Sequence, residues 1–251
     1  MTLAGEYTNQ QSWRNWESYL KVISFGYSDT ILDLGCGTGH VASIMAEGAL
    51  KVIGVDVNTD LLDKAKEING RENIEYVNWD LRKIHEANLP LADGIWASFV
   101  AAYFPDFSHV LKLWLNLLKP GGWIALVEVD DLFGHLPMSP DSREGFKKFY
   151  EAKRSRNKYD YKMGSKLTRL LTDEKLSILL DENKSDKELS FNGPADRQIL
   201  TSWENRFDRM EGLVKFFGKK KYSEIKLEFL ECLTKEEHTC NAAVRFVVAK
   251  K

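Results

Sequence analysis

The sequence predicts an α/β fold with a doubly wound, mostly parallel sheet that carries helices on both faces. Three observations predict it. Apolar runs alternate with helical patterns along the first half of the chain, a glycine-rich turn follows the first run, and three successive runs carry an acidic residue at or near their ends. In such a sheet, ligands bind at the carboxyl ends of the strands, near the point where the strand order reverses.

The first half alternates between strand and helix patterns. Short apolar runs predict five strands, in chain order at 30–35, 51–57, 74–80, 94–100 and 123–130. Helical periodicity predicts helices between them, at 40–49, 58–68 and 106–118. Asn58 or Thr59 suits the N-cap of the second of these helices. An amphipathic helix with many aromatic residues is expected at 11–23.

The second half changes character, and the sheet is expected to resume late. Charged helical patterns fill 132–186, a further strand is expected at 187–192, helices at 196–218 and a final strand at 241–251. With these two strands, we expect a sheet of seven strands. We divide the chain into an N-terminal aromatic lid (1–27), a core (28–131), a helical cap insertion (132–186) and C-terminal strands with an inserted helical segment (187–251).

The composition limits the classes of partner. The chain has 35 Lys and Arg against 37 Asp and Glu, and this near-neutral balance argues against a nucleic-acid partner. We find no signal peptide and no apolar run long enough to cross a membrane. The three cysteines, Cys36, Cys232 and Cys240, form no CxxC pair, so we expect a cytoplasmic protein without structural zinc.

The glycine-rich turn predicts a cofactor site. Gly35, Gly37 and Gly39 follow the first strand as G-x-G-x-G, where backbone N–H groups can approach a ligand closely. The dinucleotide fingerprint needs a third glycine at the position of His40, which disfavours a nicotinamide oxidoreductase. A turn with a purely structural role is the alternative.

Two acidic strand ends complete a predicted nucleoside pocket. The carboxylate of Asp56 can accept hydrogen bonds from both hydroxyls of a ribose. Asp80 can accept one from an exocyclic amine, while Trp79 or Leu81 covers a purine face. The alternative is that Asp56 and Asp80 only cap helices.

Four segments together resemble the motifs of class I S-adenosylmethionine-dependent methyltransferases, whose fold is Rossmann-like. The segments are "ILDLGCGTG", "VIGVDVN", "YVNWDL" and "LKPGGWIALVEVD". The resemblance covers about residues 28–131, and the overall plan is similar to the group that includes ubiquinone and menaquinone biosynthesis enzymes. It implies S-adenosyl-L-methionine as the cofactor and S-adenosyl-L-homocysteine as the product.

The resemblance also implies roles for single residues. Asp33 would orient the cofactor's amino group, directly or through water. Asp56 would hold the ribose diol, and Ser98 would lie near the methionine part. The complete set expected to bind cofactor is Asp33, Gly35, Cys36, Gly37, Gly39, Asp56, Val57, Asp80, Leu81 and Ser98.

The catalytic and substrate-binding candidates come from other segments. His135 could act as a general base, Glu128 could bind an amine or hydroxyl, and Tyr103 lies after the fourth strand. The alternatives are a surface loop for His135 and a cap or salt bridge for Glu128. Tyr7 and Trp13 could cover the sulfonium, because aromatic faces attract such cations, or could only dock the N-terminal helix. We expect no metal.

The sequence therefore predicts a methyltransferase that acts on a small molecule by in-line displacement. The alternatives are methylation of RNA or protein, and a binder of the cofactor without catalysis. We expect a small-molecule substrate, no membrane insertion, and a monomer or homodimer.

Overall fold

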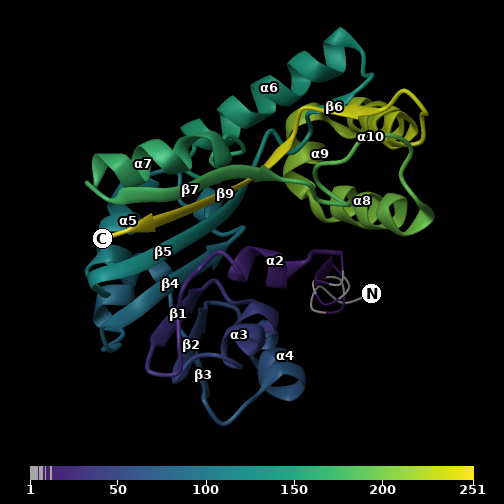
Figure 1. The fold of residues 1–251 in the computed structure, drawn as a ribbon. Helices are drawn as coiled ribbons and strands as arrows, with labels where there is room; N and C mark the ends of the chain where they lie inside the picture. Colours follow the sequence, from purple (N-terminus) through teal and green to yellow (C-terminus); the bar gives the residue numbers. More distant parts are fainter. Residues whose placement is uncertain (1–4, 6–7, 9, 12) are drawn as a thin grey trace.

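The computed structural model describes residues 5, 8, 10, 11 and 13–251, which contain one seven-stranded sheet (Figure 1). The strand order is β3–β2–β1–β4–β5–β9–β7. Neighbouring strands are parallel as far as β5, whereas β9 is antiparallel to both β5 and β7. The strands are Thr30–Leu34 (β1), Lys51–Asp56 (β2), Ile74–Asn78 (β3), Ala92–Ser98 (β4), Leu118–Asp130 (β5), Ser177–Lys184 (β7) and Ala243–Lys250 (β9). The prediction of a doubly wound, mostly parallel sheet is confirmed.

Helices cover both faces of this sheet. Side chains alternate along a strand, so Ile31 packs in one hydrophobic cluster and Leu32 in the other. The first cluster includes residues of α2 (Trp16–Leu20) and α3 (His40–Met45), and the second includes residues of η1 (Leu81–Glu86), α5 (Phe107–Leu115) and α7 (Leu167–Asp173). Helix α4 (Thr59–Asn69) contacts α3 and β3, and its N-cap is Asn58. No helix in the described part of the chain is long and apolar enough to cross a membrane.

The order of the strands creates the crevice in which a ligand can bind. From β1 the chain moves outward through β2 to β3, and it then returns to place β4 on the other side of β1. The segments that follow β1 and β4 therefore lead away from each other at the carboxyl edge of the sheet. This divergence is the switch point at which open α/β sheets bind ligands.

One strand lies outside the range expected for it. The segment 177–184, expected within the helical insertion, forms β7 at the edge of the sheet, where every second residue is exposed. The expected strand at 187–192 is reduced to a single bridge between Asp186 and Ser190. The segment 177–184 forms a strand because it pairs with β9. This pairing lets the less polar face of the segment cover an apolar surface.

A helical cap stands at one end of the sheet. It contains α6 (Pro140–Ser155), α8 (Arg197–Arg209), α9 (Glu211–Phe217) and α10 (Lys219–Leu233), with the small sheet of β6 (His135–Leu136) and β8 (Thr239–Cys240). The short helix η3 (Gly164–Lys166) contacts β5 and β9 of the main sheet. Figure 1 shows α8, α9, α10 and β6 gathered beyond the end of β9 at which the strand begins. Aromatic rings fill the interior of the cap, where Phe133 stacks on Phe146 with centroids 4.3 Å apart.

His135 lies in this cap interior and not on a surface loop. The side chain is 0% exposed, and its Nδ1 lies 2.9 Å from His238 Nε2. The Nδ1 of His238 lies 2.7 Å from the Gly193 carbonyl, to which it can only donate. His135 Nδ1–H therefore donates to His238, and its remaining lone pair faces Cys240 Sγ at 3.7 Å. Burial, and then the charge of His238, lower the pKa of His135 to about 3.

The buried imidazole predicts a loss of stability in acid. The unfolded chain binds a proton near the ordinary histidine pKa of 6.5, whereas folded His135 resists it down to about 3, so stability falls as the pH falls through this range. His135→Phe should reduce the slope of unfolding free energy against pH by up to about 1.4 kcal/mol per unit. Urea unfolding at several pH values measures the slope. Exposed His85 provides the control His85→Phe, and equal slopes in the two variants would contradict the prediction.

Candidate functional site

The glycine loop after β1 forms a cradle with one open position. Gly35, Gly37 and Gly39 have φ values of +78°, +53° and +75°, which disfavour other residues. A Cβ at Gly35 would lie 2.7 Å from a methyl group of Val100, and one at Gly39 would collide with the Tyr76 hydroxyl. A Cβ at Gly37 would meet nothing within 4 Å. Gly35 and Gly39 are therefore needed for protein packing, whereas Gly37 borders open space that a ligand can fill.

Asp33 carries an acceptor that the protein leaves unused. It lies near the end of β1 and is buried, yet its Oδ2 has no hydrogen-bond partner in the described structure. Burial, and then the charge of Asp56, raise the pKa of Asp33 to about 8. An ammonium group of a ligand would satisfy both the free oxygen and the charge.

Asp56 joins the glycine loop to the end of β2. Its Oδ2 accepts a hydrogen bond from Gly37 N at 2.9 Å, and its Oδ1 accepts one from Asn58 N at 2.9 Å. Each carboxylate oxygen has a further lone pair, so the side chain can still accept two hydroxyl groups. Val57 follows and is 67% exposed, so it offers an apolar surface beside this carboxylate.

At the end of β3, Asp80 is already engaged. It accepts from Arg82 N at 2.9 Å as the N-cap of η1, and its carboxylate also pairs with the Arg82 guanidinium at 2.6 Å. The hydrogen bonds from Arg82 lower the pKa of Asp80. Leu81 is buried, and its carbonyl accepts from the Trp114 indole. Asp80 therefore does cap a helix, and an adenine amine would have to share it with Arg82.

The segment after β4 has a strained backbone beside the crevice. Ser98 ends the strand and is half-buried, and Phe99 then adopts a left-handed conformation with φ +56°. Such a conformation is costly for a bulky residue and persists only where the surroundings hold it. The Arg14 guanidinium lies 4.8 Å from the centre of the Phe99 ring, and the Trp16 ring is 6.1 Å away.

Glu128 holds the next turn of this segment through hydrogen bonds to the backbone. It is 1% exposed, and its carboxylate accepts from Ala102 N at 3.0 Å and from Val129 N at 2.9 Å. Burial outweighs these hydrogen bonds and raises its pKa to about 7. Its observed contacts therefore fix the short helix η2 (Ala101–Tyr103) to β5.

Other candidates have mixed outcomes. Tyr103 is 56% exposed and meets the Tyr159 ring edge-on at 5.0 Å, so it can face a ligand. Trp13 is half-buried against the hydrophobic cluster of α2. Cys36 is half-buried in the glycine loop. Tyr7 lies outside the described residues. The catalytic and binding roles of these residues, and those of His135 and Glu128, remain predictions.

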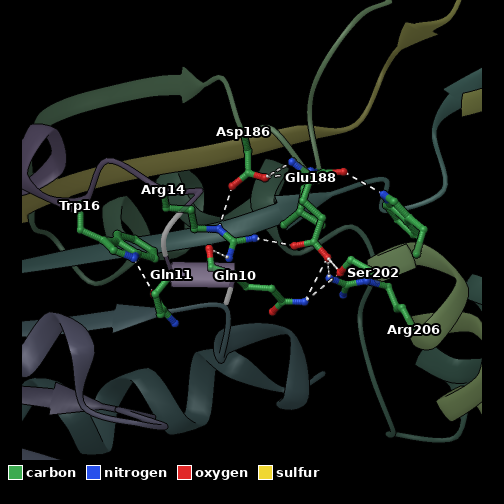
Figure 2. Close-up of polar contacts among 10 residues, drawn as sticks. Gln10, Gln11, Arg14, Trp16, Asp186, Glu188, Ser202 and Arg206 are labelled. Atoms are coloured by element: carbon green, nitrogen blue, oxygen red, sulfur yellow. Dashed lines mark hydrogen bonds and ion pairs between the residues drawn. The ribbon is translucent and has the colours of Figure 1, made fainter. Parts of the chain in front are cut away.

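The sequence analysis missed a buried network around Glu188, shown in Figure 2. Glu188 is 0% exposed and lies between β7 and α8. Four side chains donate to its carboxylate: Gln10 (3.0 Å), Arg14 (3.0 Å), Ser202 (2.8 Å) and Arg206 (2.5 Å). Burial alone would raise its pKa, but the charges of Arg206 and Arg14 hold the pKa below the ordinary value.

Arg14 connects this network to the crevice. Besides Glu188 it pairs with Asp186 at 2.7 Å, while its guanidinium also covers Phe99. The N-terminal segment is thus fixed both to the cap and to the end of β4. The only local sequence pattern that could have indicated this network is the placement of polar Gln10 and Arg14 four residues apart beside an aromatic-rich segment.

The acidic residues at the end of β5 do not form a metal centre in the described structure. Lys162 Nζ lies 3.0 Å from Asp131 and 3.8 Å from Asp130. Among the residues for which side chains are described, no three His, Cys, Asp or Glu are placed to hold a metal ion.

Comparisons with known proteins agree with this geometry. A family model described as a methyltransferase domain matches residues 27–189. The ubiquinone biosynthesis O-methyltransferase of Serratia proteamaculans is 28% identical over 100 residues, which cover 39% of this chain and 42% of that protein. The ribosomal protein L11 methyltransferase of Vibrio cholerae is 34% identical over 104 residues, which cover 41% of this chain and 34% of that protein. The chain thus spans less than half the length of these curated relatives.

A solved structure extends the likeness over the whole chain. The phosphoethanolamine N-methyltransferase 2 of Haemonchus contortus, in complex with S-adenosyl-L-methionine, superposes with a TM-score of 0.59 at 20% identity. The superposition covers 100% of this chain and 57% of that one. At this identity the likeness shows a common fold.

The glycine loop gives a matched pair of substitutions. Gly37→Ala and Gly39→Ala impose similar left-handed strain, about 1–2 kcal/mol each, but only the Gly39 methyl collides with the protein. Gly39→Ala should therefore have the lower thermal midpoint. Gly37→Ala should fold but bind S-adenosyl-L-homocysteine at least about tenfold more weakly, because its methyl occupies the ligand's space. Unchanged affinity in Gly37→Ala would place the ligand elsewhere.

Asp33 predicts a pH-dependent affinity. Its raised pKa of about 8 leaves the carboxyl protonated at lower pH, whereas a ligand ammonium needs the carboxylate. Affinity for S-adenosyl-L-homocysteine should therefore rise towards pH 8, by up to about tenfold per unit, with release of a proton. Calorimetry in two buffers of different ionisation enthalpy measures that proton. Asp33→Asn should bind weakly and lose this dependence, and a wild-type affinity without pH dependence would refute the prediction.

Proposed function

This chain belongs to the class I S-adenosylmethionine-dependent methyltransferases, and on that premise we propose that it transfers a methyl group from S-adenosyl-L-methionine to a small-molecule acceptor. The family model matches well over half of the described chain, and the strand order agrees with a Rossmann-like core. The cofactor, the acceptor and the transfer are our inferences from this membership and from the site.

The observation that carries the proposal is the unused Oδ2 of Asp33, on the strand that leads into the glycine loop, together with the open space at Gly37 in that loop. These two features fit a ligand with an ammonium group and a compact body next to the glycine loop. The free lone pairs of Asp56 fit a ribose diol, and exposed Val57 fits a purine face. Together they suit the cofactor implied by the family.

The residues around the crevice would act by placement more than by acid–base chemistry. Held by Asp33, Asp56 and the glycine loop, S-adenosyl-L-methionine would supply an electrophilic methyl group to a nucleophilic atom of the acceptor, and the electron pair of the broken carbon–sulfur bond would stay on sulfur. The protein has to align the acceptor and exclude water. Phe99 and Arg14, which lie over the end of β4, would provide this exclusion.

A small acceptor fits the covered site better than a macromolecule does. The buried ion pairs of Glu188 fix the N-terminal segment to the cap, across the end of β4. RNA or a folded protein would need a broad approach to the methyl group. Among the relatives, one is named for ubiquinone biosynthesis and another for a ribosomal protein, so the acceptor class requires a direct test.

Transfer of a labelled methyl group supplies that test. The protein is incubated with S-adenosyl-L-methionine bearing a deuterated methyl group and with a cell extract separated into small-molecule and macromolecular fractions. Mass spectrometry should find the label in a small metabolite. Label confined to RNA or protein would overturn the acceptor class, and cofactor binding without any transfer would indicate a non-catalytic binder.

The Asp56→Ala variant tests whether transfer of the labelled methyl group depends on the proposed cofactor site. Loss of the carboxylate removes charge-assisted hydrogen bonds to the ribose, so cofactor affinity should fall at least about tenfold, which is about 1.4 kcal/mol. Calorimetry measures the affinity, and labelling at low cofactor concentration should fall in parallel. Asp60→Ala, on the first turn of α4, is the control. Unchanged affinity in Asp56→Ala would mean that the pocket is misassigned.

A further inference from the structure

A second cavity, of about 460 Å³, lies beside the first turns of α6. Its walls come from the loop after β5, from α6 and from Lys162 and Asn241. No lining residue belongs to the glycine loop, β1, β2 or β4, so the cavity is separate from the cofactor crevice. We propose that this cavity binds a small molecule carrying a dianionic phosphoryl group.

The charges in the wall are only partly neutralised by the protein. Lys162 pairs with Asp131 at 3.0 Å and with Asp130 at 3.8 Å. Glu144 pairs with Lys148 at 3.9 Å. These contacts account for both acidic side chains that line the cavity and for one of its three cations.

The other two cations, Arg143 and Lys147, are unpaired. They lie four residues apart on α6, so they share one face of the helix. Both side chains are exposed at the mouth of the cavity, and within the described residues neither has an ion pair or a side-chain hydrogen bond. Two adjacent positive charges are satisfied by a dianion, whereas a monocarboxylate would leave one of them unmatched. A phosphoryl group also offers the oxygens that the Arg fork and the Lys ammonium can share.

Part of the remaining wall is apolar and can contact the body of such a ligand. Phe146 is buried and stacks on Phe133, whose ring plane is tilted by only 12°. Leu136 and the ring of Tyr150 also line the cavity. A phosphomonoester with a compact apolar or aromatic body would use both parts of the wall, while free phosphate would use only the cations.

The start of α6 does not supply the recognition. Ser139 Oγ caps the helix by accepting from Ser142 N at 3.2 Å, and the Glu228 carboxylate accepts from Ser139 N. Because these groups already serve the helix end, binding depends on the Arg143 and Lys147 side chains.

Calorimetric titration of the full chain with phenyl phosphate tests the proposal. Arg143→Gln and Lys147→Gln should each weaken binding at least about fivefold, since each removes one charge-assisted contact. Arg154→Gln is the matched control, because Arg154 is an exposed cation on the same helix outside the cavity. Absence of binding, or equal affinity in all three variants, would overturn the proposal. Thermal midpoints show that the variants are folded.

Two further ligands test the chemistry of the site. Benzoate has the same ring with a single negative charge and should bind at least about fivefold more weakly than phenyl phosphate. Equal affinity for benzoate would refute the requirement for a dianion. Inorganic phosphate that binds as tightly as phenyl phosphate would support the phosphoryl site and identify free phosphate as its ligand. Asp56→Ala should retain phenyl phosphate binding, and its loss there would place the probe in the cofactor crevice.

Discussion

The buried carboxylate of Glu188 is the interaction on which the arrangement of the site depends. A carboxylate that is removed from water costs several kcal/mol unless other groups satisfy it. Its four side-chain donors come from the N-terminal segment and from α8, while its own backbone continues from the edge strand β7. The charge is satisfied only where these three parts meet, so the N-terminal segment, the cap and the edge strand stabilise one another's placement.

The same network explains how a strained residue can persist beside the crevice. Phe99 has a left-handed backbone, and the guanidinium of Arg14 and the ring of Trp16 both lie against its side chain. Glu128, buried near the end of β5, anchors η2, the short helix that follows β4 and Phe99. The shape of the crevice at β4 is therefore set from outside by distant segments, since the local sequence alone would favour a relaxed turn.

Whether a feature could be predicted from the sequence depends on how far apart its interacting residues lie along the chain. The glycine loop and Asp56 lie within about one strand–turn–helix unit, where positive φ and strand alternation leave clear patterns. Strand β7 was expected as a helix because its half-polar pattern becomes a strand only beside β9. Glu188 and Arg14 are 174 residues apart, and His135 meets its partner His238 across 103 residues. No local pattern records such pairings.

The buried acids also show how a ligand site differs from a structural site of the same chemistry. Glu188 and Asp33 are both enclosed, yet the pKa of Glu188 is lowered and that of Asp33 is raised to about 8. The difference lies in their partners, because cationic donors surround Glu188 while Asp33 Oδ2 has no hydrogen-bond donor in the described structure. An unsatisfied buried acceptor weakens the fold unless something external completes it. Such a group is best explained where a cation binds, and its strand leads into the glycine loop, in which only Gly37 borders open space.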